Sequence, residues 1–593
     1  MNNQGIRVSD PLPLFRSSLL LLAILVVLAA GVVAQGTPSG RAPGVPVDWT
    51  SHHLIFTAPT SGAAAAGNAS LAGDPRAIHS ALVHGFSLSG QATASGAATK
   101  SGNGSKPPKV TTQVDWSVSL GAGNVAPNMY PAKFGASGTV ADCTNDYAVF
   151  ALNVPGTTGG QANLIAFNNL YSGAGSSLCG LTAPTVLFSY NVSTVGGSIL
   201  TSPITSIFGD RIIFVESTST AAVLHVLTWH AGEGTSATNS AAPANRCNLD
   251  LGPCVCPAGA SCDRTLTLNS TIGSTFSSPF PDYFALNDAV YVGTDDGTLY
   301  RVGGALYGTP SIVWTSPVSG GVLTGPAILF DITTNDQVEL AVYVGDDSGI
   351  VYKVDPATGT VAGTTLTVGG GFPNGGLMDT PIVDNSNGTV FAFSADDGTS
   401  AVVVQADPAL TELRRDQVGK SVANGLTPAV NLHTGMFDNN YFNDPNTGFL
   451  YLCGTNDLNT RPVLYRFGFT AGTMNAGNGG TLELTNTAGV ECSPLTEIFN
   501  SNITAHDDTL FLGLLGGCGT TGCIRDYNLD IPNGAPPPLT LMPTAFLNSV
   551  NEAGGTSGII VDNVDPSPQA SSIYFSTLGT SKRAVKLTQS QLK

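Results

Sequence analysis

The chain has 593 residues, of which 11% are charged and 42% hydrophobic, and its formal net charge is −18. This composition excludes disorder of the whole chain and supplies enough apolar surface for one large core or two ordinary ones. The negative charge repels phosphate backbones, so we expect no nucleic-acid partner.

The N-terminus predicts a signal peptide over residues 1–34. Arg7 and Arg16 precede an apolar run over residues 18–30, and small residues follow it. This order predicts export and cleavage, and hence a secreted, periplasmic or cell-surface protein with no membrane span after signal removal. The alternative is an uncleaved anchor, because an apolar stretch of roughly 17 residues is at the lower limit for crossing a bilayer.

Residues 35–110 are rich in Ala, Gly, Ser, Thr and Pro, with low-complexity pieces at 62–67 and 101–108. A stretch of this composition buries too little apolar surface to offset the entropy lost on ordering. We therefore expect a mostly flexible tether, in which only Leu54–Phe56 and Ala77–Val83 are apolar enough to dock locally.

Residues 111–593 carry a repeat of about fifty residues, which is typical of a β-propeller. Its clearest copies are the strand-turn-strand units Ala289–Val302, Ala341–Val354 and Thr389–Gly398. Before each strand pair stands a second signal, a small residue, then Pro or Gly, then an apolar strand, which suits the crowded start of an innermost strand. This signal begins at Thr201, Ser277, Thr324, Asp379, His433, Cys492 and Thr556.

A divergent unit over 147–190 precedes these seven starts, so the sequence predicts a single all-β propeller with eight blades, seven being the alternative. The last unit ends at 584–587 one strand short, and an isolated strand over 114–120 precedes the first blade. We expect residues 114–120 to complete the C-terminal blade and close the ring, which removes the exposed sheet edges of an open array.

Ten cysteines, an even number, favour an oxidising compartment and disulfides. Their local grouping predicts bridges within blades or their loops. A metal site is the alternative around residues 254–262, but no histidine lies nearby and no C-x2-C pair exists. The disulfide candidates are Cys143, Cys179, Cys247, Cys254, Cys256, Cys262, Cys453, Cys492, Cys518 and Cys523.

No residue set predicts a catalytic, cofactor-binding or metal site. The acidic pairs at 295–296, 346–347 and 396–397 recur in register, but next to glycine they are turn formers rather than cation ligands. His433 stands at a blade start and faces either the channel or the core. The chain has no G-x-S-x-G, P-loop, H-E-x-x-H or C-x-x-C-H motif.

The units Asp288–Val302 and Val342–Gly359 resemble the repeat of pyrroloquinoline-quinone-type β-propellers, clearly over 273–405 and faintly elsewhere. That family includes quinoprotein dehydrogenases and an outer-membrane assembly factor. The resemblance implies the propeller fold. Neither activity follows, because the chain has no adjacent Cys-Cys pair, only four Trp residues and no lipidated Cys after its apolar run.

The sequence therefore favours a secreted, monomeric, non-enzymatic propeller that serves as a binding or scaffold module for a protein or glycan partner, without a cofactor. Enzymatic activity stays open. The competing hypothesis is a quinone-dependent or otherwise divergent oxidoreductase with its site at the central channel.

Overall fold

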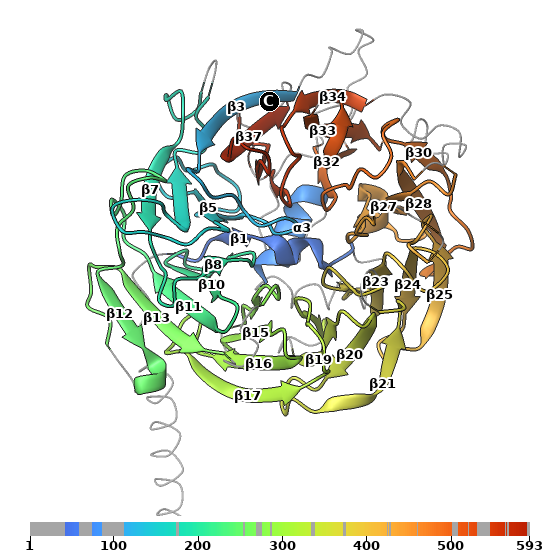
Figure 1. Ribbon diagram of the computed structural model, residues 1–593, viewed down its shortest axis with the longest axis horizontal. Coiled ribbons are helices and arrows are strands. Elements are labelled where there is room, and N and C mark those ends of the chain that lie inside the picture. The colour runs from blue at the N-terminus through green and yellow to red at the C-terminus, as the bar shows by residue number, and fades with distance from the viewer. Residues whose placement is uncertain are drawn as a thin grey trace, which may run out of the picture. The chain divides into compact units, whose positions relative to one another are not determined.

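The computed structural model describes residues 42–58, 74–85 and 112–589, with gaps at 174–176, 253–254, 269–274, 285–286, 334–337, 372–374, 424, 426–428, 459, 501–507, 520, 530–545, 564 and 566–568. In this part of the chain the strands form eight sheets, arranged as blades around one axis (Figure 1). The predicted eight-bladed all-β propeller is thus confirmed.

Blades 1 to 4 follow one another along the chain. Blade 1 contains β4 (Ala132–Gly135), β5 (Tyr147–Ala151), β6 (Leu164–Asn168) and β7 (Thr185–Tyr190). Blade 2 contains β8 (Ser198–Ile199), β9 (Ile204–Thr205), β10 (Arg211–Ser217), β11 (Ala222–Thr228), β12 (Asn245–Asn248) and β13 (Cys262–Thr267). Blades 3 and 4 contain β14 (Phe280–Asp282), β15 (Ala289–Gly293), β16 (Thr298–Gly303) and β17 (Ser311–Pro317), then β18 (Ala327–Phe330), β19 (Glu339–Gly345), β20 (Ile350–Val354) and β21 (Val361–Thr367).

Blades 5 to 8 complete the ring. Blade 5 contains β22 (Ile382–Asp384), β23 (Thr389–Ser394), β24 (Val402–Ala406) and β25 (Glu412–Gln417). Blade 6 contains β26 (Met436–Phe437), β27 (Phe449–Thr455), β28 (Pro462–Thr470), β29 (Thr473–Met474) and β30 (Thr481–Glu483). Blades 7 and 8 contain β31 (Thr496–Phe499), β32 (Asp508–Cys518), β33 (Thr521–Asn528) and β34 (Phe546–Asn551), then β35 (Ile560–Asp562), β36 (Ser572–Ser576) and β37 (Arg583–Gln589).

The ring closes through β3 (Thr112–Ser119), which pairs antiparallel with β37 as the outer strand of blade 8. Val114 lies opposite Leu587 and Trp116 opposite Lys586, the pairing that the sequence predicted. Trp116 is buried between the rings of Phe167 and Tyr574 and donates from Nε1 to the Leu170 carbonyl at 2.9 Å. The first and last blades are therefore joined by side-chain packing as well as by strand pairing.

The N-terminal segment fills the middle of the ring (Figure 1). Strand β1 (Val45–Val47) pairs antiparallel with β4 of blade 1, and β2 (Leu54–Ile55) pairs parallel with β22 of blade 5. Between them lies the 3-10 helix η1 (Trp49–His52), and helix α3 (Pro75–His84) follows. We call residues 42–58 and 74–85 the plug. Leu54–Phe56 and Ala77–Val83 dock as the sequence allowed, whereas the flexible tether expected for the rest of the plug is not found. Residues 59–73 and 86–111 lie outside the described part.

The sequence explains why α3 forms. Asp74 is the N-cap and accepts the Arg76 N–H, Pro75 occupies the first turn, and Gly85 ends the helix at φ 73°. The Arg76 guanidinium is buried, lies 2.7 Å from Asp74 and donates to the Pro281 carbonyl at 3.0 Å. It also lies over the rings of Phe280, Tyr283 and Phe330. The ion pair thus lies within α3 and its cap, and the Arg76 guanidinium contacts blades 3 and 4 through the Pro281 carbonyl and these aromatic rings.

Four disulfides confirm the predicted local pairing. They join Cys143 to Cys179, Cys256 to Cys262, Cys453 to Cys492 and Cys518 to Cys523. Cys247 is disulfide-bonded as well, while Cys254 lies outside the described residues. Cys453 of β27 is tied to Cys492 in the loop that leads from blade 6 into blade 7. Bridges in this number are typical of an oxidising, extracellular environment.

Candidate functional site

The innermost strands begin with a repeated hydrogen bond. Three residues before the first paired residue, a hydroxyl accepts a backbone N–H from the second strand of the same blade. This holds for Thr201, Ser277, Thr324, Ser493 and Ser557, whose donors are Val215, Gly293, Gly345, Gly513 and Ser576. A small hydroxyl suits this place because it replaces a ladder bond in a crowded region of the ring.

Blades 1, 5 and 6 depart from this pattern, with Met129, Asp379 and His433 at the corresponding positions. All three departures lie at the same mouth of the channel. These three blades lack, at this position, the hydroxyl that accepts the backbone N–H. A position that departs from a structural repeat in this way is a candidate for a functional role.

Asp379 and His433 form a charged triad with Glu491. His433 Nδ1 lies 3.0 Å from Asp379 Oδ2, and its Nε2 lies 3.1 Å from Glu491 Oε1. The Asp379 oxygen also accepts the Thr434 N–H at 2.9 Å. The disulfide from Cys453 to Cys492 holds the residue next to Glu491 against blade 6. Three successive blades thus meet through one histidine, whose side chain is buried.

Burial opposes the charge on His433, but Asp379 and the hydrogen bonds to both carboxylates outweigh it and raise the pKa of His433 to about 10. Burial likewise opposes charge on Asp379 and Glu491, yet His433 lowers the pKa of both carboxyls. The triad therefore carries one positive and two negative charges at neutral pH.

This raised pKa predicts a pH-dependent contribution to stability. Below the unfolded value of 6.5 the imidazole is protonated in both states, so the ion pairs contribute fully. As the pH rises toward about 10, the unfolded chain loses the proton first and the contribution disappears. Thermal unfolding of the wild type and a His433→Gln variant should differ most near pH 6 and least near pH 10; a gap independent of pH would contradict this.

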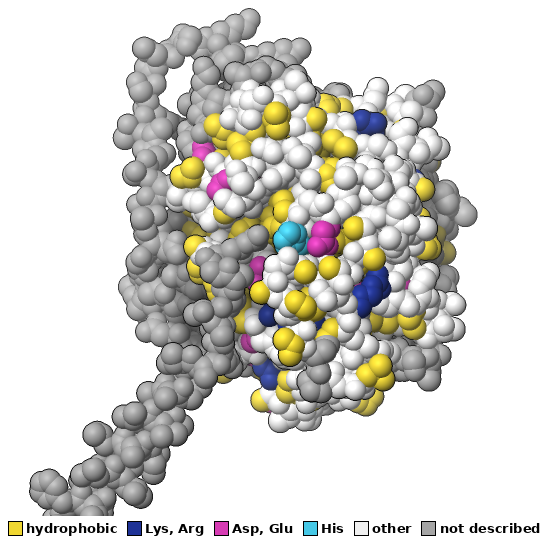
Figure 2. All heavy atoms as spheres, turned by 90° about the vertical axis from the view of Figure 1, so that its left-hand side faces the viewer, with side chains coloured by type: hydrophobic (Ala, Val, Ile, Leu, Met, Phe, Trp, Pro, Cys, Tyr) yellow, Lys and Arg dark blue, Asp and Glu magenta, His cyan; other side chains and the backbone are white. Residues whose placement is uncertain are grey.

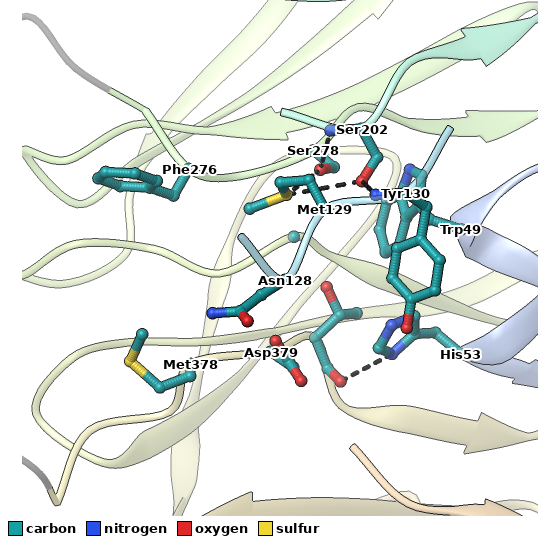
Figure 3. Close-up of a pocket in the computed structure, with 12 residues that line it drawn as sticks. Trp49, His53, Asn128, Met129, Tyr130, Ser202, Phe276, Ser278, Met378 and Asp379 are labelled. Atoms are coloured by element: carbon teal, nitrogen blue, oxygen red, sulfur yellow. Dashed lines mark hydrogen bonds between the residues drawn. The ribbon is translucent and has the colours of Figure 1, made fainter. Parts of the chain in front are cut away.

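A hollow opens beside the triad, with a cavity volume of about 20 Å³. Its walls come from the starts of several blades and from the plug, as Figure 3 shows. Trp49, His53 and Tyr130 are buried, whereas Phe276 and Met378 at the opening are 49% and 48% exposed. The other lining residues are Asn128, Met129, Ser202, Ser278, Gly325, Asp379 and Thr380.

The hollow carries negative charge. Burial lowers the pKa of His53 to about 4, so its imidazole is neutral, and Nδ1 lies 2.9 Å from the Thr380 carbonyl. Burial, with the charge of Asp379, raises the pKa of Tyr130 well above its ordinary value. Asp379 is then the one charged residue in the lining, which contains no lysine or arginine.

A second cavity, of about 30 Å³, lies between α3 and the innermost strands of blades 6 to 8. Burial lowers the pKa of its histidines His52 and His84 to about 3 and of His79 to about 4. Burial and the nearby charge of Asp508 raise the pKa of Glu497 well above its ordinary value. The three imidazoles are therefore neutral at pH 7.

The structure places the other sequence candidates in structural roles. The acidic pairs lie in turns, where Asp296, Asp346 and Asp396 accept backbone N–H groups beside glycines with positive φ. His225 has two carboxylate partners, as His433 does, but it is fully buried inside blade 2. Of the remaining histidines, His230 is partly exposed and His506 lies outside the described residues.

Sequence reasoning singled out His433 and missed Asp379, Glu491 and the hollow. The available signal was the alignment of blade starts, where Asp379 and His433 replace a serine or threonine. Among the described residues, no group of three or more His, Cys, Asp or Glu side chains is placed to hold a metal ion. No helix in this part of the chain is long and apolar enough to cross a bilayer.

The geometry defines a closed eight-bladed β-propeller whose channel is filled by its own N-terminal segment. No family model matches the chain, so the resemblance to pyrroloquinoline-quinone-type repeats has no support beyond the fold. No curated protein matches it either.

Solved structures resemble the chain in fold alone. Sqt1 from Chaetomium thermophilum is 12% identical, with 81% of this chain and 99% of that chain covered and a TM-score of 0.47. Sqt1 from Saccharomyces cerevisiae is 9% identical, with 80% and 99% covered and a TM-score of 0.47. The designed protein Ika8 is 12% identical, with 80% and 99% covered and a TM-score of 0.43. These similarities carry no argument about function.

Proposed function

We propose that this protein is an extracellular, non-enzymatic binding module that docks a protein partner at the mouth of its plugged channel. The observation that carries the proposal is the plug, which occupies the axis where a propeller enzyme would hold a cofactor. What stays open at the mouth is a shallow hollow with two half-exposed apolar side chains, Phe276 and Met378. Aromatic and methionine side chains of this kind are enriched at protein interfaces.

The dimensions favour this role over the alternatives. Small-molecule sites are usually cavities of about 300–1,000 Å³. The two cavities described here measure about 20 and 30 Å³, which is too little for a quinone cofactor or a sugar ring. A flat protein surface needs no such volume, so a protein partner is favoured over a glycan.

The surface has the chemistry of an extracellular module. The side of the ring seen in Figure 2 carries few charged groups among apolar and neutral polar ones. Together with the net charge of −18, this favours neither nucleic acid nor an anionic membrane. We further propose that residues 1–34 direct export and that the mature protein is a monomer.

Site-specific photocrosslinking tests the docking site. Benzoylphenylalanine replaces Phe276 at the mouth or, as a matched control, Val313 on the outer strand of blade 3, which is 51% exposed. Purified protein is returned to the surface and culture medium of its source cells and irradiated. We expect a discrete crosslinked protein from position 276 and none from 313; equal or absent crosslinking at 276 would refute the docking site.

The oxidoreductase alternative is tested separately. Purified protein incubated with pyrroloquinoline quinone and calcium should show no shift in quinone absorbance and no dye-linked oxidation of alcohols or sugars. Either signal would favour the enzyme. A glycan array is the matching test for a carbohydrate partner. If a glycan binds the wild type and this binding is lost on substitution of Phe276, the partner is a glycan and not a protein.

A further inference from the structure

We propose that the hollow at the channel mouth binds the ammonium group of a lysine side chain presented by the partner. This inference rests on the proposed docking function and adds the chemistry of recognition.

The charge comes from Asp379. Its Oδ2 accepts from His433 Nδ1 and from the Thr434 N–H, whereas Oδ1 accepts no hydrogen bond from the described residues. Asp379 lines the hollow, and the lining contains no lysine or arginine to neutralise it. Glu491 offsets the positive charge of His433 at Nε2, on the side of the imidazole away from Asp379. A mostly buried carboxylate whose Oδ1 has no donor among the described residues favours a cationic hydrogen-bond donor.

The rings of the lining favour a cation over a neutral donor. Figure 3 shows Trp49 and Tyr130 on one side of the hollow and Phe276 on the other, with Asp379 below them. Aromatic faces attract ammonium and guanidinium groups through the ring quadrupole, and tryptophan does so best. Tyr130 keeps its proton, because its pKa is raised well above the ordinary value, so it contributes a neutral ring and a hydroxyl.

The volume of the hollow favours a primary ammonium over larger cations. A cavity of about 20 Å³ admits a group about the size of a water molecule. A primary ammonium is of that size, whereas a planar guanidinium or a trimethylammonium is larger. Gly325 helps to keep the space open, because a Cβ there would lie 2.8 Å from the Trp49 ring and 2.4 Å from the Thr380 hydroxyl.

The test uses short probes and two matched variants. Saturation-transfer NMR of the purified full chain is recorded with acetyl-Gly-Lys-Gly-amide and with its norleucine, arginine and trimethyllysine analogues. Asp379→Asn removes the charge that lines the hollow. Glu491→Gln removes the other carboxylate of the same histidine, which does not line it. Thermal unfolding verifies that each variant folds.

We expect transfer to the lysine ε-methylene in the wild type, at least about tenfold weaker binding in Asp379→Asn and less than about twofold change in Glu491→Gln. The norleucine probe should give no transfer, and the two bulkier cations should bind more weakly than lysine. Phe276→Ala, at an exposed position, should weaken lysine binding even if Asp379→Asn fails to fold.

Several results would overturn the inference: no transfer to lysine, equal transfer to norleucine, or equal loss in both carboxyl variants. Its failure is distinguishable from failure of the docking function. Crosslinking from position 276 without lysine binding would support the docking site and contradict ammonium binding. Lysine binding without a crosslink would support ammonium binding and contradict the docking site.

Discussion

Replacing Arg76 with alanine is expected to lower the free energy of unfolding by about 3–5 kcal/mol, because it leaves a buried carboxylate without its counterion. Asp74 and Arg76 are both almost fully buried, 2.7 Å apart, between α3 and blades 3 and 4. The substitution also leaves the Pro281 carbonyl without this donor and removes the cation above three aromatic rings. Calorimetry and denaturant unfolding give the size of the loss.

Two further variants separate the buried pair from a general charge effect. Arg461 pairs with Glu483 at 2.7 Å, but both side chains are about one-third exposed, so Arg461→Ala should cost at most about 1 kcal/mol. The double variant Asp74→Asn, Arg76→Met removes both charges and should recover part of the loss. A cost for Arg76→Ala no greater than that for Arg461→Ala would mean that the plug is not held as described.

Replacing Lys586 with alanine is expected to weaken the closure of the ring by a similar amount, about 3–5 kcal/mol. Lys586 is fully buried, lies 3.0 Å from Asp115 of β3 and donates to the Gln569 carbonyl at 2.6 Å. Its ammonium lies 5.6 Å from the ring centre of Tyr171 of blade 1, and Lys133 lies over the same ring. The substitution thus removes the buried ammonium that lies between Asp115 of blade 8 and Tyr171 of blade 1.

Hydrogen exchange locates this effect. Because β3 and β37 hold the two ends of the ring together, we expect their amides to lose protection first while blades 3 to 5 stay protected. Lys582→Ala, which removes a less buried lysine near the start of the same strand, should change neither segment. Joint replacement of Asp115 by Asn and Lys586 by Met should restore part of the protection. Unchanged exchange in β3 and β37 would contradict the proposed closure.

The repeat, the turns, the ring closure and the local disulfides were predictable from the sequence because each depends on residues close together in the chain or on a repeated pattern. Asp296 and Gly297, for example, form their turn within one hairpin. Even Trp116 was identifiable, because the strand around it looked like an outer strand without a blade.

Only the tertiary structure determined that the N-terminal segment is buried as a plug and which side chains meet at the channel mouth. Val45, Val47 and Trp49 lie in a stretch whose average composition predicts a tether, and they are buried because the ring of blades surrounds them. His433 meets Asp379 and Glu491 across 54 and 58 residues, since the ring brings equivalent positions of neighbouring blades together. Local pattern thus determined the blades, and closure of the ring determined which of their ends meet.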